Sequence, residues 1–444
     1  MTMKKLNRRK FLQGTGLVSV AGMGGLQLGF ANTLLNRGSG ATGQNLLVYV
    51  FLDGGMDGLN MVPPRSGPDY TQYSSVLRPN LHIPSSQSLA LNGQSAFGMH
   101  PSAPGLAQLF NDNHMAIIHA TGLLEANRSH FEATKFMELG TQGVSSLGTG
   151  WLTRYFNSSV HTPSDAVMPS IVPSYGNTDA VLGDPTALVM ANPQEFSLSD
   201  GHWAWTDTMQ DILADIHANP ETLEQLVAHQ TLNASDIIQA IDWDNYTPGG
   251  GADYPVSFLG DQLRTVAQLY KNNVNLEVAY VPTGGWDTHV GQGTGTTGQF
   301  ADLTSNLSAG LAALYQDLSA SHPGQFTIIV QSEFGRRAYE NSDQSTDHGY
   351  GNPMFVIGEE VNGGFYGQFP GLSPAQLFEG GDVEATVDYR DVVSEVLIKR
   401  QRNRFLGYIF PGYSDYMPLG IVNGASLTPI YEEDYDPLFA SGFE

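Results

Sequence analysis

Leu46-Leu47-Val48-Tyr49-Val50-Phe51-Leu52 is a continuous apolar run, and it ends directly in Asp53-Gly54-Gly55. A run without alternating polar residues predicts a strand that is buried on both faces, as in a parallel sheet. The two glycines predict a tight turn where that strand ends. Four further apolar runs of this kind follow at 115–120, 276–281, 326–330 and 354–357.

Amphipathic helices are predicted between these runs. A stripe of apolar residues recurs every three or four positions just before the fourth run: Phe300, Leu303, Leu307, Leu311, Leu314 and Leu318. Such spacing gives a helix one apolar face. Helices are also predicted for segments 257–269 and 388–399. Buried runs that alternate with amphipathic helices predict an α/β fold, in which helices cover both faces of a mostly parallel sheet.

The middle of the chain differs from the rest. Between residues 151 and 254 the strand signal fades, a helical pattern covers 220–243, and Pro248-Gly249-Gly250-Gly251 predicts a flexible joint. We interpret 151–254 as a cap-like insertion in a single domain that spans residues 41–444.

The N-terminus predicts export. Asn7-Arg8-Arg9-Lys10-Phe11-Leu12 precedes a glycine-rich apolar run from 14 to about 31, which is typical of a twin-arginine signal within residues 1–40. A basic extension of a core helix is the less favoured alternative, because such a helix rarely carries five cations and no acid before its apolar part. The run is too weakly apolar for a stable membrane helix. We expect a periplasmic or secreted protein that the twin-arginine translocase exports and that keeps no membrane span once mature.

Composition excludes several kinds of site and partner. The chain of 444 residues contains no cysteine, so disulfides, thiolate metal sites and cysteine nucleophiles are absent. Its formal net charge of −24 disfavours nucleic acid as a ligand. An anionic substrate would therefore need a local positive centre, such as a metal ion, a helix N-terminus or one of the few arginines.

Carboxylates and imidazoles gather after the predicted strands. The candidates are Asp53, Asp57, Asp287, His289, Glu333, Asp347 and His348. In an open parallel sheet, ligands bind beyond the carboxyl ends of the strands. Asp287 and His289 are two positions apart in an extended segment, so both side chains can reach one ion. Each motif alone could be an ordinary turn or hydrogen-bond network, but together they predict a metal site for zinc, manganese or iron.

A candidate nucleophile follows the second apolar run. Ser129 opens a predicted helix, and Glu132 lies three residues later, which is the pattern of a capping box. The functional alternative is that Ser129 attacks phosphorus, sulfur or a carbonyl carbon, while Arg128 holds an anionic group. We do not expect His130 to be the base, because adjacent side chains at a helix start point apart.

These motifs resemble a family of twin-arginine-exported proteins of unknown function within the sulfatase and alkaline phosphatase superfamily. The resemblance covers nearly the whole mature chain. The stretches that carry it are 51–60, Arg128-Ser129-His130-Phe131, Gly150-Trp151-Leu152, Gly285-Trp286-Asp287-Thr288-His289, Ser332-Glu333-Phe334-Gly335-Arg336, Thr346-Asp347-His348-Gly349 and 388–392.

The resemblance implies an alkaline-phosphatase-like α/β core with one or two divalent cations, for which zinc, manganese and calcium are the candidates. It places the nucleophile at Ser129. It assigns metal-ligand positions to Asp53 or Asp57, Asp287, His289, Glu333 and His348.

The chain departs from the superfamily pattern after Glu333. Hydrolases of the superfamily carry an aspartate followed directly by histidine there, whereas Glu333 is followed by Phe334. Either a single metal remains, or Asp347 or Asn352 replaces the missing ligand.

The sequence and the resemblance together predict an exported, metal-dependent hydrolase of phosphate or sulfate esters with a serine nucleophile and a small anionic ester as ligand. The alternative is a non-catalytic exported protein whose degenerate site binds a glycan or an envelope component. A metal-dependent enzyme of another reaction class is the third possibility.

Overall fold

A computed structural model describes residues 45–162, 166–196, 206–295 and 297–432. The proposed export signal in 1–40 lies outside these ranges. Within them, nine strands form one sheet in the order β10-β4-β9-β8-β1-β7-β5-β6, with β11 paired to β4. The strands are β1 (Leu46–Leu52), β4 (Met115–Gly122), β5 (Ser170–Val172), β6 (Leu188–Val189), β7 (Val278–Thr283), β8 (Phe326–Gln331), β9 (Asn352–Ile357), β10 (Gly364–Tyr366) and β11 (Val387–Asp388).

Strand β1 lies inside the sheet and is buried along its whole length, as its apolar run predicted. It pairs in parallel with both β7 and β8, so that Tyr49 lies opposite Tyr280 on one side and Ile329 on the other. Alternate side chains of β1 enter two different cores: Val48 and Val50 pack on one face, and Tyr49 and Phe51 on the other.

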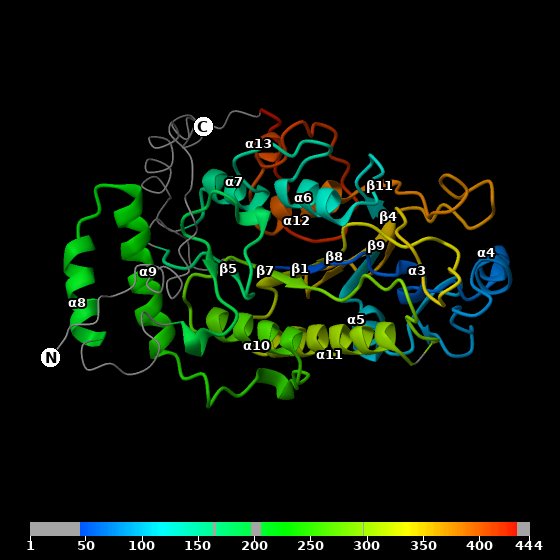
Figure 1. Ribbon diagram of the computed structural model, residues 1–444, viewed down its shortest axis with the longest axis horizontal. Helices are drawn as coiled ribbons and strands as arrows, with labels where there is room; N and C mark the ends of the chain where they lie inside the picture. The colour runs from blue at the N-terminus through cyan, green and yellow to red at the C-terminus, as the bar shows by residue number, and fades with distance from the viewer. Residues whose placement is uncertain (1–44, 163–165, 197–205, 296, 433–444) are drawn as a thin grey trace, which may run out of the picture.

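Helices cover both faces of this sheet (Figure 1), which confirms the α/β prediction. One face carries α5 (Pro104–Asn111), α10 (Phe258–Lys271) and α11 (Gln299–Ser319). The opposite face carries α6 (His130–Leu139), α7 (Trp151–Ser158), α12 (Tyr389–Lys399) and α13 (Leu406–Ile409). The predicted apolar stripe lies on α11, and five of its six members are buried. Burial of each such leucine or phenylalanine is worth about 1.5–3 kcal/mol.

Strand β9 departs from the parallel pattern, because it runs antiparallel to its neighbours β4 and β8. The chain therefore leaves β8 and enters β9 at the same edge of the sheet. The connecting loop, which carries Glu333 at one end and His348 at the other, lies at the edge where the parallel strands end.

The middle segment contributes to the main sheet as well as to one end of the molecule. β5 pairs with β7, and β6 pairs with β5 at the edge of the sheet. Two helices, α8 (Thr206–His217) and α9 (Leu223–Ala240), contact each other at the end of the molecule opposite α4 (Figure 1). A cap function for this segment stays a prediction.

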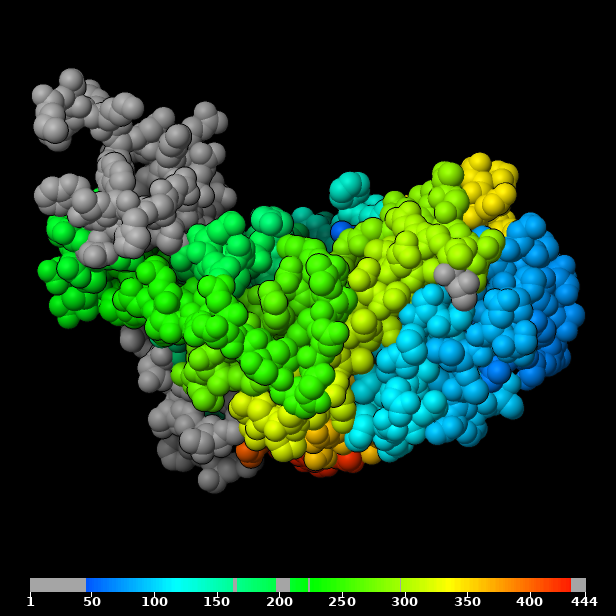
Figure 2. Space-filling model, turned by 90° about the horizontal axis from the view of Figure 1, so that it is seen from below, coloured from blue at the N-terminus to red at the C-terminus, as the bar shows by residue number. Residues whose placement is uncertain are grey.

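Shorter elements complete the described chain. They are α3 (Gly58–Met61), α4 (Gly67–Gln72), a π-helical turn at Tyr73–Leu77, β2 (Leu89–Ala90), β3 (Gly98–Met99), and single 3-10 turns at Asp179–Val181, Pro193–Glu195 and Gly249–Gly251. Figure 2 shows the face formed by α10 and α11, with residues of α4 and its neighbours at one end and those of α8 and α9 at the other. Among the described residues, no helix combines the length and the apolar character needed to span a bilayer.

Candidate metal centre

Four side chains converge at the edge of the sheet where the parallel strands end: His130, Asp287, His289 and His348. His130 is the first residue of α6, Asp287 and His289 follow β7, and His348 precedes β9. One ligand atom from each residue lies within 4.8 Å of the ligand atoms of the other three.

The spacing of these atoms suits a small shared cation. His348 Nε2 lies 2.8 Å from both His130 Nε2 and His289 Nε2. Asp287 Oδ1 lies 2.9 Å from His289 Nε2 and 3.2 Å from the Nε2 atoms of His130 and His348. Tetrahedral zinc, with bonds of about 2.0–2.1 Å, holds its donors about 3.3 Å apart. These five distances thus lie within about half an ångström of the spacing that zinc imposes.

The other nitrogen of each imidazole fixes where its proton lies. The Nδ1 atoms face oxygen atoms that accept hydrogen bonds: Glu333 Oε1 at 2.6 Å from His130, Asp347 Oδ1 at 3.1 Å from His289, and the Arg128 carbonyl at 2.8 Å from His348. With its hydrogen on Nδ1, a neutral imidazole presents an Nε2 lone pair to the group. Histidines that bind metals are oriented in this way. Three lone pairs and a carboxylate oxygen directed at one point repel one another unless a cation lies between them.

Glycines after β1 allow the Asp287 loop to approach. Gly54 has φ +124°, and a Cβ there would lie 2.3 Å from the Asp287 nitrogen. Gly55 has φ +68°, and its Cβ would lie 2.6 Å from the ring of Phe334. Only glycine fits such an approach without strain, which explains the Asp53-Gly54-Gly55 sequence at this turn.

Arg336 connects this turn to the loop that contains Asp287. Its buried guanidinium donates to the carbonyls of Gly54, Gly55 and Trp286 and to Asp287 Oδ1, the last at 2.7 Å. Partial burial acts to raise the pKa of Asp287, but the neighbouring Arg336 and histidines outweigh it and lower this pKa to about 2. Asp287 is therefore an anion at neutral pH and retains the charge that a metal ligand needs.

Glu333, a predicted metal ligand, lies against His130 and is almost completely buried. Its Oε1 accepts from His130 Nδ1 at 2.6 Å and from the Gly54 amide at 2.9 Å, and its Oε2 accepts from Ser332 at 3.0 Å. The hydrogen bond to Glu333 is the main reason why the pKa of His130 is raised, against the effect of burial. The structure thus places Glu333 where it orients a ligand of the group.

Asp57, another predicted ligand, is fully buried and pairs with Arg78 at 2.7 Å. It also accepts from the Gln292 amide at 2.7 Å, and Gln292 in turn accepts from Ser345 and Thr346. Gln292 belongs to the loop of Asp287 and His289, whereas Ser345 and Thr346 belong to the loop of His348. Asp57 therefore stays outside the group of four and helps to hold its two loops together.

Asp53 lies beside the group with an exposed side chain. Partial burial raises the pKa of Asp53, and the charges of Glu333 and Asp287 raise it further, against the opposing effect of His130. The Asp53 carbonyl accepts from the Trp286 amide at 3.4 Å, and the amide of the next residue, Gly54, donates to Glu333, so Asp53 adjoins the group.

Ser129 lies between two residues that contact the group. The helix begins where predicted, but the predicted capping box is wrong, because the Ser129 side chain forms no capping hydrogen bond. Asn127 Oδ1 instead accepts from the Ser129 amide at 2.8 Å. The preceding Arg128 carbonyl binds His348, and the following residue is His130. The guanidinium of Arg128 pairs with Asp382 and, at 2.7 Å, with Glu379.

The sequence analysis considered His130 only as a base and did not name it as a metal ligand, whereas the structure places its ring in the group of four. Its position in the sequence could have identified it, because His130 follows the carboxyl end of a predicted strand, as the other candidate ligands do.

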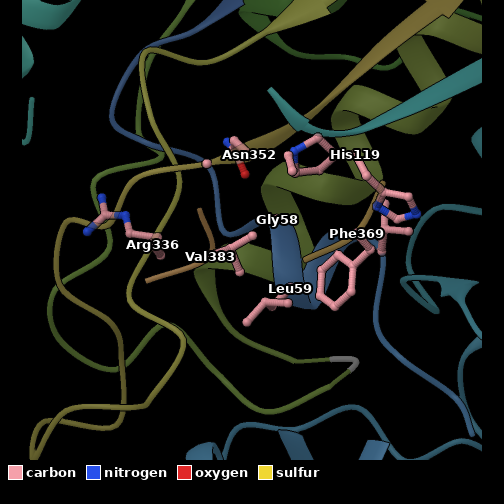
Figure 3. A pocket seen from close by; sticks show the side chains of 11 residues that line it. Gly58, Leu59, His119, Arg336, Asn352, Phe369 and Val383 are labelled. Carbon is pink, nitrogen blue, oxygen red and sulfur yellow. The ribbon is translucent and has the colours of Figure 1, made fainter. Parts of the chain in front are cut away.

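A small cavity is lined in part by Arg336 (Figure 3). Asn352, the other residue considered as a replacement ligand, lines this cavity and donates to the Phe334 carbonyl at 3.0 Å. Its Oδ1 lies so close to Gly58 that a Cβ there would be 2.2 Å away. His119 lines the cavity too, and burial lowers its pKa to about 4.

Comparison with known proteins gives a partial match of sequence. A family model described as a protein of unknown function (DUF1501) matches residues 261–402, the part of the chain that contains Asp287, His289, Glu333 and His348. No curated protein matches the chain.

Several solved structures show limited similarity. The C-terminal periplasmic domain of EcEptC from Escherichia coli, in complex with zinc, is 9% identical over 72% of this chain and 74% of its own, with a TM-score of 0.34. Alkaline phosphatase from the Antarctic bacterium TAB5 is 11% identical over 73% and 95%, with a TM-score of 0.30. The lipoteichoic acid synthase LtaP from Listeria monocytogenes is 10% identical over 76% and 74%, with a TM-score of 0.30. These TM-scores are low, and the α/β assignment rests on the sheet itself.

Proposed function

We propose that this protein is a metal-dependent hydrolase of phosphate or sulfate esters. The observation that carries the proposal is the convergence of three Nε2 atoms and one carboxylate oxygen, with every Nδ1 hydrogen directed at an oxygen acceptor. This arrangement is suited to a cation and has no evident purpose in packing. A bound divalent cation would polarise the ester and stabilise the charge that develops on it during hydrolysis.

The donor set narrows the choice of metal. Calcium prefers oxygen ligands, whereas three imidazoles and one carboxylate suit zinc, manganese or iron. We therefore propose a transition metal of this group, bound by His130, Asp287, His289 and His348.

Ser129 is the proposed nucleophile. It precedes the N-terminus of α6, where backbone amides and the helix dipole favour an anionic group. The absence of a capping bond leaves its hydroxyl available for attack. The preceding Arg128 carbonyl contacts His348, and the following residue, His130, belongs to the group of four, so the position of Ser129 is coupled to that of the proposed ligands.

Two observations favour the alternative of a binding protein with a degenerate site. Phe334 occupies the position where the superfamily pattern has a histidine directly after the aspartate. The Arg128 guanidinium is paired with two acids. Catalysis therefore has to be separated experimentally from metal binding.

The test measures bound metal and ester hydrolysis in wild type, His289→Ala, Ser129→Ala and the control His322→Ala. His322 follows α11 at the opposite edge of the sheet. We expect His289→Ala to lose metal and activity, Ser129→Ala to keep metal and lose activity, and the control to keep both. Metal without hydrolysis of any phosphate or sulfate ester supports the binding protein. Wild-type protein that binds no metal refutes the metal-dependent hydrolase and leaves the binding protein.

We further propose that the protein is exported by the twin-arginine translocase to the periplasm or beyond. Arg8 and Arg9 carry this proposal. Replacing both with lysine should retain the full-length protein inside the cell, as fractionation would measure; unchanged export would exclude this route.

A further inference from the structure

The charge around the four ligands is unbalanced. Four carboxylates belong to the group or adjoin it: Asp287, Glu333, Asp347 and Asp53, whose carbonyl accepts from the amide next to Asp287. In the described ranges, Arg336 is the one arginine or lysine that forms an ion pair with any of them. The histidines must be neutral to bind a metal. The site then carries three negative charges, and a single divalent cation reduces this to one.

The neighbouring arginines do not change this balance. Arg128 and Arg337 both pair with the buried carboxylate of Asp382, and Arg128 also pairs with Glu379. Two cations and two carboxylates cancel, so they offer no net positive charge to a substrate.

We propose that the site accepts tetrahedral esters that carry at most one negative charge, namely sulfate monoesters or phosphate diesters, in preference to phosphate monoester dianions. This inference rests on the proposed function and specifies its substrate class. The side chains of Asp287 and Asp347 are 46% and 55% exposed, so a bound substrate meets their charge directly. A second charge on the substrate is opposed by carboxylates that one cation does not neutralise.

Phe131 is an exposed apolar side chain at the start of α6. Its side chain is 91% exposed although it directly follows the ligand His130. Side chains in a helix lean towards its N-terminus, which for α6 is the end at the metal group. An aryl or alkyl group on the ester can therefore pack against this ring.

The charge preference can be measured without turnover. Calorimetry on the metal-loaded full chain would compare phenylphosphonate, a dianion in mildly alkaline buffer, with its monomethyl ester, a monoanion. We expect the monoanion to bind more tightly and the difference to shrink as salt is added. Competition by inorganic phosphate shows whether the probes occupy the metal site.

Two variants remove one site charge each. Asp53→Asn and Asp347→Asn should each shift the ratio of the two affinities towards the dianion by about three- to tenfold, as expected for one charge a few ångströms away in a partly exposed site. In the Asp347→Asn variant, the oxygen of the new amide can still accept from His289. The matched control is Asp236→Asn on α9, which changes the net charge equally but lies far from the site and should leave the ratio unchanged.

The contribution of Phe131 is tested with two monoanions that differ only in their apolar group, methyl phenylphosphonate and methyl methylphosphonate. Phe131→Ala should weaken the first by roughly tenfold, as expected for lost burial of a ring, and leave the second unchanged. Equal effects on both would contradict a contact with the organic group.

The outcomes separate this inference from the proposed function. If neither probe binds the metal-loaded protein and no ester is hydrolysed, the proposed function fails and the substrate class fails with it. If the dianion binds more tightly, or if two cations are bound per chain, the hydrolase proposal survives and the charge preference is refuted. Hydrolysis of aryl sulfates and diaryl phosphates then distinguishes the two ester chemistries.

Discussion

Glu333→Gln separates the charge of Glu333 from its geometry. The glutamine Oε1 can still accept from His130 and from the Gly54 amide, as Glu333 Oε1 does at 2.6 and 2.9 Å. Its amide nitrogen can donate to the Ser332 hydroxyl oxygen, while the single hydroxyl hydrogen goes to the Leu52 carbonyl at 2.6 Å. The variant should therefore keep the position of the imidazole and lose the negative charge behind it.

The magnitude follows from the hydrogen bond that changes. A hydrogen bond to a charged group is worth about 1.5–3 kcal/mol and a neutral one about 0.5–1.5 kcal/mol, a difference of about 1–1.5 kcal/mol. Since 1.4 kcal/mol corresponds to a factor of ten, we expect metal affinity to fall by roughly tenfold. This agrees with the 10- to 100-fold losses typical when the partner of a metal-binding histidine is changed.

The assay is competition for zinc against a chromophoric chelator, together with thermal unfolding of the metal-free chain. Glu138→Gln is the matched control. Glu138 lies in α6 and, like Glu333, is a carboxylate that accepts several hydrogen bonds; its donors are Thr178, Asp179 and Tyr280. It should change stability and leave zinc affinity intact. An unchanged zinc affinity in Glu333→Gln, or a loss as large as in His130→Ala, would refute the view that Glu333 acts through the charge it places behind His130.

Three further predictions concern stability and the loops. Asp57→Ala should lower the free energy of unfolding by about 3–5 kcal/mol in urea denaturation, because it leaves Arg78 buried and unpaired; a loss below about 1 kcal/mol would contradict this pairing. Gly54→Ala should weaken zinc binding more than it lowers the melting temperature, because its Cβ would displace the Asp287 loop; equal affinity in the chelator assay would refute the close approach. Burial raises the pKa of Glu138, so its protonated form is favoured in the folded chain. The free energy of unfolding of wild type, relative to that of Glu138→Gln, should therefore fall as pH rises from the pKa of an unfolded glutamate, about 4.3, through the raised pKa of Glu138 in the folded chain. A difference that does not change with pH in this range would contradict the prediction.

The sequence predicts the centre of the fold better than its edges. The bounds of β1 coincide with the apolar run, and α10, α11 and α12 lie within two residues of their predicted ranges. Strands β5 and β6 escape prediction, because three and two residues are too few to show a hydrophobic period. The antiparallel direction of β9 is equally hidden, since an apolar run does not encode the direction in which its strand pairs.

The candidate site shows a similar limit. Asp287, His289 and His348 were predicted to share one metal, and the structure brings their ligand atoms together. Asp57 is a carboxylate after a strand end, as the predicted ligands are. Its pairing with Arg78 could not be predicted, because Arg78 does not follow a strand. His130 was considered only as a base for Ser129 and was not named among the metal ligands. Both residues are decided by contacts between segments that are distant in sequence, which spacing alone does not reveal.

These contacts also bear on how the metal site relates to folding. Each ligand has its own support: Glu333 for His130, Asp347 for His289, the Arg128 carbonyl for His348, and Arg336 for Asp287. The supports come from the sheet edge and its loops, which are held by buried hydrogen bonds that involve no metal. We therefore expect this site to fold without an ion, unlike small domains whose core is the metal itself. The fold instead brings the imidazole nitrogens and the Asp287 carboxylate close together. We expect a bound cation to relieve the repulsion between these electron-rich atoms.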